Sequence, residues 1–282
     1  MKYIFSTSIW AFALSTLFWF GCGTTPTEPD DKEKNSSNDN SLAQNEFDEI
    51  ARAFNTEASL SPTLNKIEAT SAYFCNGATL DVVDNGNGTY TMTMDFGSGT
   101  TCTDQKKREG KLVGVFNGKW NVTGSKVTIT PDNYFVTTTG GTKYGFVFTK
   151  TITNLGINAA TYHEYNTKIT DAVLTSTAGT ILWQSDRTVE WVEGFGSNDP
   201  ATYKYNIKTG TASGTATNGV QFSAVITSPL VVDNSCQYRI TKGVLEITPV
   251  GAAKRVIDYG DGTCDDKATL TIGSFTSTLV LR

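Results

Sequence analysis

Histidine is almost absent from this sequence: His163 is the only one in 282 residues. Histidine is the usual general base of serine and cysteine hydrolases and a common metal ligand, so its scarcity removes most sites of those kinds. The motifs G-x-S-x-G and H-E-x-x-H are also missing. His163 lies in the polar stretch 158–166, where we expect a surface residue. A histidine-based hydrolase is therefore not predicted.

Carboxylates at catalytic spacing are lacking as well. Glu190 and Glu193 are the pair to test, because a glycosidase needs two acids beside the bond it cleaves. Residues three apart on a strand point to opposite faces, which argues against this pair. Acids from distant strands could still meet, so an uncharacterised hydrolase stays as an alternative. We predict no catalytic residues and no enzyme activity.

Basic residues are too few for nucleic-acid binding. The chain has 23 Lys and Arg against 28 Asp and Glu, a net charge of −5. Its only dense basic cluster is Lys106-Lys107-Arg108, and no basic stripe accompanies it. Nucleic-acid binding relies on many Lys and Arg contacts to phosphates. We therefore expect no nucleic-acid partner.

Residues 1–21 have the features of a targeting segment. Lys2 precedes an apolar run from Ile4 to Phe20, and Gly21-Cys22 ends the run. A small residue before a cysteine at this place resembles a bacterial lipobox. That resemblance implies a signal peptide over 1–21 and a lipid on Cys22. The alternative is an uncleaved membrane anchor, because about 18 apolar residues approach the spanning length.

Cysteine is scarce, and its count of five is odd. If Cys22 carries a lipid, four cysteines remain. The stretch DFGSGTTC (95–102) is written again as DYGDGTC (258–264), and each copy follows an earlier cysteine. We predict two hairpins, each closed by its own disulfide: Cys75–Cys102 and Cys236–Cys264. Stable disulfides indicate an oxidising compartment outside the cytoplasm.

The glycine-rich repeat has two interpretations. It could bind calcium in its second copy, where four aspartates cluster: Asp258, Asp261, Asp265 and Asp266. The other interpretation is a tight turn, with glycines at positive φ and aspartates accepting bonds from backbone N–H groups. The spacing does not fit the EF-hand pattern. We favour the turn and expect no cofactor, with calcium as the alternative.

The mature chain is predicted to begin with a disordered tether over 22–45, which has almost no apolar residue. A helix is predicted over about 42–60. Its start is indicated by the capping-box spacing of Ser41 and Gln44. Its apolar residues fall on one face at helical spacing and are expected to cover the sheet: Phe47, Ile50, Ala51 and Phe54.

Apart from that N-terminal helix, residues 46–282 are predicted to be an all-β domain. Strand-like alternation recurs between turn signals such as Gly140-Gly141 and Gly273-Ser274. The pattern favours an antiparallel β-sandwich or a partly closed barrel. The repeat allows two pseudo-symmetric halves.

Aromatic residues are plentiful and suggest one ligand class. A row of exposed rings could stack on sugars, and four residues in strand-like stretches are candidates: Trp183, Trp191, Tyr203 and Tyr205. Core packing is the commoner fate of such residues. A carbohydrate-binding β-sandwich is thus an alternative function.

Two stretches carry a family resemblance. RVIDYGDGTCDDKATLTIG (255–273) and RTVEWVEGFG (187–196) resemble uncharacterised surface or outer-membrane lipoproteins of Bacteroidota. The resemblance implies attachment to the cell envelope by a lipid and says nothing about a ligand. Together with the residues, it predicts a non-enzymatic outer-membrane or cell-surface lipoprotein with a binding or structural role. Its partner there would be a glycan or a protein.

Overall fold

The computed structural model describes residues 31, 33–60, 68–70, 75, 77–102, 104–120, 122–197, 199–236, 239–265 and 267–280. The predicted lipid site Cys22 and signal peptide 1–21 lie outside these residues. No helix in the described part of the chain combines the length and the hydropathy needed to cross a bilayer.

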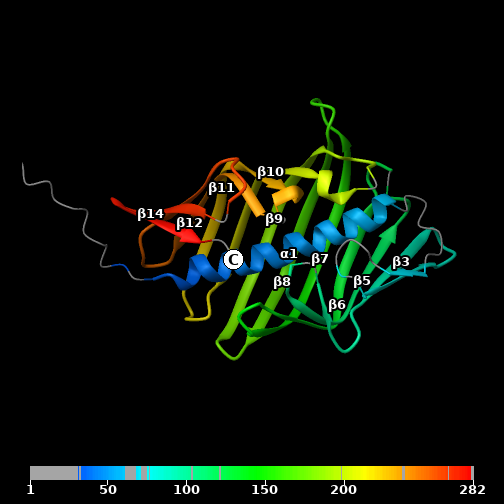
Figure 1. Ribbon diagram of the computed structural model, residues 1–282, viewed down its shortest axis with the longest axis horizontal. Helices are drawn as coiled ribbons and strands as arrows, with labels where there is room; N and C mark the ends of the chain where they lie inside the picture. The colour runs from blue at the N-terminus through cyan, green and yellow to red at the C-terminus, as the bar shows by residue number, and fades with distance from the viewer. Residues whose placement is uncertain are drawn as a thin grey trace, which may run out of the picture.

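One long helix precedes a series of antiparallel strands (Figure 1). The elements, with two short 3-10 helices η1 and η2, are α1 (Asn35–Leu60), β1 (Glu68–Thr70), β2 (Thr79–Asp84), β3 (Thr89–Asp95), β4 (Thr100–Thr101), β5 (Lys107–Asn117), β6 (Lys126–Thr137), β7 (Lys143–Ile157), β8 (His163–Ser176), β9 (Gly179–Glu193), η1 (Pro200–Thr202), β10 (Lys204–Thr215), β11 (Gln221–Asp233), η2 (Asn234–Cys236), β12 (Arg239–Pro249), β13 (Arg255–Asp261), β14 (Lys267–Ile272) and β15 (Phe275–Val280).

The strands form one sheet in which chain neighbours are sheet neighbours. The order runs from β1 to β15, with β4 pairing β5 beside the main path. The described strands do not close the sheet, because β1 and β15 are its two ends. This confirms the all-β, sandwich-like prediction with one N-terminal helix. The repeated hairpins β2–β3 and β12–β13 lie in the same sheet, near its opposite ends.

Alternation along each strand separates an inner and an outer face. On β7, Phe146, Phe148 and Ile152 are buried, whereas Val147 and Thr149 between them are exposed. Helix α1 crosses the strands on the side of the buried residues (Figure 1). The core therefore lies between α1 and the inner face.

The apolar face of α1 packs on the sheet as predicted. Phe47, Ile50 and Phe54 are each at most 1% exposed. Phe47 stacks on Trp183 of β9, with ring centroids 5.2 Å apart. Phe54 lies over Gly114 of β5, where an added Cβ would be 2.3 Å from the Phe54 ring. A glycine is needed at this close approach.

The predicted start of the helix is wrong. The helix begins at Asn35, so residues 35–45 are helical and do not belong to a disordered tether. Ser41 lies inside the helix, and the Glu33 carboxylate instead accepts a bond from the Ser36 N–H at 2.9 Å. The sheet stabilises this polar first part of the helix, because Asp39 accepts two bonds from Thr217 in the β10–β11 turn. Such distant partners cannot be seen in a polar segment by itself.

Candidate functional site

The four aromatic residues proposed for sugar stacking are buried, so that prediction is wrong for these residues. Trp183, Trp191, Tyr203 and Tyr205 are each at most 2% exposed. Both indole N–H groups bind protein groups: Trp183 Nε1 donates to Asn40 Oδ1 at 3.0 Å and Trp191 Nε1 to the Glu193 carbonyl at 2.7 Å. Trp183 and Trp191 on β9, Tyr205 on β10 and Tyr203 just before β10 all belong to the buried core.

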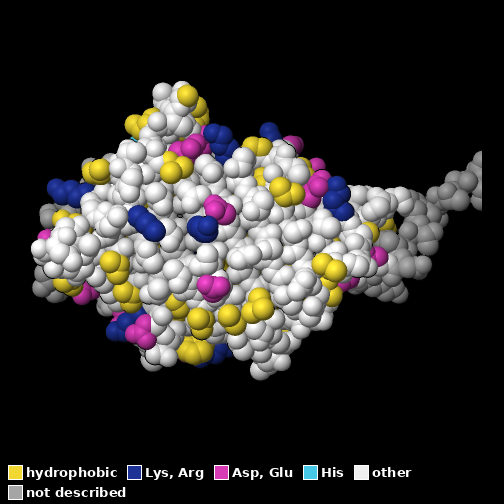
Figure 2. All heavy atoms as spheres, turned by 180° about the vertical axis from the view of Figure 1, so that it is seen from behind, with side chains coloured by type: hydrophobic (Ala, Val, Ile, Leu, Met, Phe, Trp, Pro, Cys, Tyr) yellow, Lys and Arg dark blue, Asp and Glu magenta, His cyan; other side chains and the backbone are white. Residues whose placement is uncertain are grey.

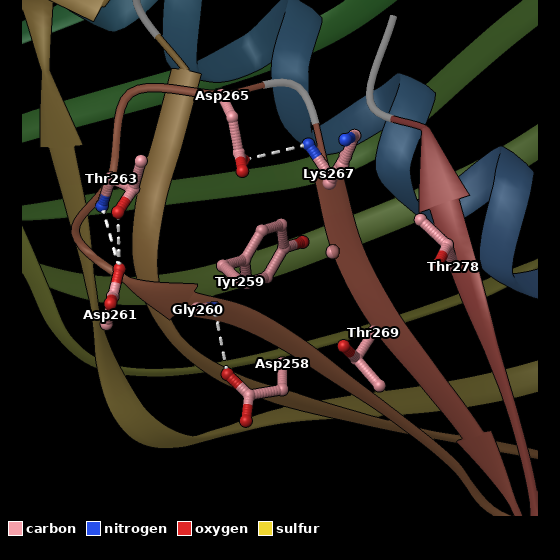
Figure 3. Close-up of a pocket in the computed structure, with 10 residues that line it drawn as sticks. Asp258, Tyr259, Gly260, Asp261, Thr263, Asp265, Lys267, Thr269 and Thr278 are labelled. Atoms are coloured by element: carbon pink, nitrogen blue, oxygen red, sulfur yellow. Dashed lines mark hydrogen bonds between the residues drawn. The ribbon is translucent and has the colours of Figure 1, made fainter.

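The second copy of the repeat borders a cavity of about 220 Å³ (Figure 3). Asp258 accepts a bond from the Gly260 N–H, Asp261 from Thr263 and Asp265 from Lys267. In Figure 3 each of these carboxylates bonds to a residue two positions further along the chain. Gly260 and Gly262 have φ of 91° and 111°. This is the predicted turn geometry.

The calcium alternative gains no support from this arrangement. Among the described residues, no three His, Cys, Asp or Glu side chains gather in a group able to hold a metal. Asp266, the fourth candidate, lies outside the described residues. The first copy shares the turn, since Asp95 Oδ1 accepts from the Gly97 N–H at 2.8 Å.

Both predicted disulfides are present. Cys75 bonds to Cys102 and Cys236 to Cys264, with Cα–Cα distances of 4.2 and 5.4 Å. The first closes the β2–β3 hairpin and the second closes β12–β13. Each repeat unit is thus stapled locally.

A cluster of exposed apolar side chains marks the tip of the β7–β8 hairpin. Leu155, Ile157 and Tyr162 are 44%, 65% and 36% exposed, and Phe195 in the β9–β10 loop is 42% exposed. We call these four residues the hairpin tip. Figure 1 shows this hairpin projecting beyond the sheet, and Figure 2 shows hydrophobic side chains on the projection. The tip is therefore an exposed apolar surface.

Aromatic rings pack against Phe195 of the hairpin tip. His163 stacks on Phe195 with centroids 3.5 Å apart, and Trp191 meets the edge of the same ring at 5.0 Å. Trp191 in turn contacts Tyr203 at 4.5 Å. Partial burial lowers the pKa of His163, which favours the neutral ring at neutral pH. The exposed Phe195 is therefore held on a rigid base.

A charged cluster lies beside the hairpin tip. Glu164 on β8 is directly opposite Glu190 on β9. Asn158 Nδ2 donates to both carboxylates, at 3.2 and 2.7 Å. Lys208 Nζ lies 3.4 Å from Glu164 and 3.0 Å from Glu190. Because one cation serves both acids, the cluster carries about one negative charge.

The partner of Glu190 is therefore Glu164 and not Glu193. Glu193 pairs instead with Lys204, at 3.2 Å. Sequence spacing could not find the Glu164–Glu190 pair, because β8–β9 register brings the two acids together across 26 residues of chain. Leu155 and Ile157 are apolar residues beside a turn, where residues are normally polar. They were therefore a sequence signal for the hairpin tip.

A second concave region lies on the outer face of β8 to β12. It is a groove of about 530 Å³ lined mainly by hydroxyl, amide and charged groups, including Lys168, Gln184, Asp186, Thr211, Ser213 and Glu246. Gln184 Nε2 donates to Ser213 Oγ at 2.9 Å. None of the groove residues is aromatic. The groove could bind a polar ligand by hydrogen bonds without ring stacking.

Comparisons with known proteins add no functional assignment. No family model, no curated protein and no solved structure matches this chain.

Proposed function

We propose that this protein is a lipid-anchored protein of the cell envelope that binds a protein partner through the hairpin tip and is not an enzyme. Export is supported by the two disulfides, which need an oxidising compartment. Attachment is supported by the lipobox-like Gly21-Cys22 and by the odd cysteine count. The envelope of a Bacteroidota-type cell, with the outer membrane as its site, is the location that the sequence resemblance suggests.

The exposed hairpin tip is the observation that carries the binding role. Large exposed apolar side chains that gather in one place are typical of interaction sites. Here three of them lie on the projecting β7–β8 hairpin, and the fourth, Phe195, stacks on His163. A pre-ordered apolar tip loses little side-chain entropy on binding.

The adjoining charges define the partner further. Glu164 and Glu190 share Lys208 at the base of the tip. A partner that meets the tip must therefore contact an apolar surface bordered by weak negative charge. A protein surface with an apolar pocket and a basic rim has this complementarity.

Site-specific photo-crosslinking in cells tests the binding role. A photoreactive residue at Ile157 should give a discrete crosslinked product, and the same residue at Val115 should not. Val115 is a matched control, because it is 44% exposed but lies on β5, two strands away from β7 in the sheet. A product made equally from both positions would contradict a specific site at the tip.

The glycan alternative is favoured only by the polar groove. Glycan binding there should be weakened by Gln184→Ala and be insensitive to Ile157→Asp. The hydrolase alternative predicts turnover that Glu164→Gln or Glu190→Gln abolishes. We expect a glycan array and a hydrolase panel to be negative, since the groove has no aromatic ring for stacking and the two acids share Lys208 and Asn158.

A further inference from the structure

The segment just before helix α1 is held to the sheet by Asp31. Asp31 forms a two-bond pair with Arg255 at the start of β13, with both N–O distances 2.7 Å. It also accepts a bond from the Ala253 N–H at 2.7 Å. Arg255 is fully buried. The bond from Arg255 lowers the pKa of Asp31 to about 2, so the pair stays charged at neutral pH.

The Asp31–Arg255 pair, which we call the clamp, leaves a short connection to the proposed lipid site. Nine peptide units join Cys22 to Asp31. Their fully extended reach is about 30 Å. Helix α1, with 26 residues, is about 39 Å long. A lipid on Cys22 would therefore keep the Asp31 end of the molecule nearest to the membrane.

The strand register assigns the hairpin tip and the clamp to opposite ends of the strands. Ile157 pairs with His163, which pairs with Trp191, so these residues lie at one end, the tip end. At the other end Thr215 pairs with Gln221, whose carbonyl accepts from the Val250 N–H at 2.8 Å. We call this the base end, and it carries the β12–β13 turn that holds Asp31.

The base end presents an apolar side chain beside exposed lysines. Val250 in the β12–β13 turn is 69% exposed, the most exposed large hydrophobic residue of the described chain. Lys34 adjoins the clamp and is exposed, and Lys254, in the same turn as Val250, is exposed and paired with Glu246 at 2.9 Å. The acids of this end accept bonds within the protein: Asp31 and Glu33 share Arg255, and Asp39 accepts from the uncharged Thr217. Apolar and basic groups are what a lipid surface binds.

We propose that the base end docks on the lipid bilayer, with the Val250 turn at the headgroups and the hairpin tip directed away from the membrane. This inference rests on the proposed lipidation of Cys22. It assigns the exposed valine to the membrane and leaves the tip free to meet a partner at a distance from the lipid.

Thiol accessibility on the full-length protein tests the orientation. Val250→Cys and Ile157→Cys each introduce a thiol, at residues that are 69% and 65% exposed. Each purified, lipidated variant is placed in vesicles of phosphatidylethanolamine and phosphatidylglycerol and treated with a membrane-impermeant maleimide. The rate in vesicles is divided by the rate in detergent. Intact disulfides and an unchanged Tm verify that each variant is folded.

We expect the vesicles to slow labelling severalfold at position 250 and to leave position 157 unchanged. Equal ratios at the two positions would overturn the docking proposal, as would stronger protection at 157, which would make the tip the membrane contact. Failure of the lipid anchor is distinguishable from failure of the docking proposal. In that case the wild-type chain would not bind vesicles, or Cys22→Ser would bind them equally well.

Discussion

Arg187 on β9 and Asp48 on α1 form an ion pair inside the protein, with Arg187 Nη1 3.3 Å from Asp48 Oδ2. Their side chains are 2% and 16% exposed. Gln44, one turn earlier on the helix, accepts a bond from Arg187 Nη2 at 3.0 Å. This pair therefore fits only one register of α1 on the sheet, because sliding the helix by a turn would leave Arg187 buried without a counter-ion.

Two further buried arginines repeat the arrangement along the helix. Arg255 pairs with Asp31 ahead of the helix, and Arg108 Nη2 lies 3.6 Å from Glu46. In each case a cation of the inner face meets an acid of the N-terminal segment, although the acid nearest to Arg108 is Asp104 in the β4–β5 loop, at 2.7 Å. These pairs set the register of α1 across the strands.

Breaking the Arg187–Asp48 pair should destabilise the fold strongly. Asp48→Asn leaves a buried guanidinium without its counter-ion, and we expect a loss of about 3 kcal/mol in the free energy of unfolding. The control is Asp186→Asn, which removes an exposed pair with Lys168 and should cost less than about 1 kcal/mol. Urea unfolding measures both; equal losses would show that the internal pair does not hold the helix.

Lys150 should make stability depend on pH. It is 1% exposed on the inner face, and burial is the main cause that lowers its pKa from 10.5 to about 7. Asp48 opposes this shift, whereas Arg187 and Arg52 add to it. Between about pH 7 and 10.5 the unfolded chain binds more protons than the folded one, so stability rises with pH.

Lys150→Met removes this titration and tests its sign. The wild-type free energy of unfolding should gain up to about 1.4 kcal/mol per pH unit relative to the variant between pH 8 and 9. At pH 7 the variant should be the more stable protein. Parallel stability curves for the two proteins would contradict a neutral buried lysine.

The disulfides should act as two local staples. Replacing Cys75 and Cys102 together by alanine should lower stability by about 3–4 kcal/mol, because a loop of this length is no longer closed in the unfolded chain. Non-reducing peptide mapping of the wild type should yield only the 75–102 and 236–264 peptides. A peptide linking Cys75 to Cys236 or Cys264 would show that the hairpins are not self-contained.

Gly110 should tolerate no side chain. Its φ is +78°, and an added Cβ would lie 1.9 Å from the Asn133 carbonyl oxygen. Gly118 is the control, since its φ is +94° but nothing lies within 4 Å of an added Cβ. Gly118→Ala should cost about 1–2 kcal/mol for the backbone conformation alone, and Gly110→Ala should lower Tm considerably more. Equal Tm values would contradict the close approach of β5 and β6 at Gly110.

Lipidation of Cys22 is expected to attach the protein to the membrane. Cys22→Ser should release the protein from membranes or leave an uncleaved precursor, because the acylated sulfur is lost. Metabolic labelling with a fatty acid should mark the wild type and not the variant. An unlabelled wild-type chain would contradict the lipoprotein proposal.

The sequence by itself determined the features that depend on local pattern. Alternation identified the strands, the Phe47–Phe54 stripe identified the buried face of the helix, and the repeated D-[FY]-G-x-G-T…C motif identified both disulfide pairs. The turn chemistry at Asp258 and Gly260 also followed from residue type. Each of these features arises from residues near in sequence, where φ preference and side-chain period decide the structure.

Only the tertiary structure decided the features made by distant segments. Asn35–Gln44 is helical because Thr217 and Trp183 supply partners for its polar groups. Trp183, Trp191, Tyr203 and Tyr205 became core because their strands turn that face toward α1. Glu164 met Glu190, and Phe195 met His163, through strand register that no local pattern encodes. The physical reason is that such contacts depend on which faces of distant segments come together, whereas local pattern specifies only each segment's own period and turns.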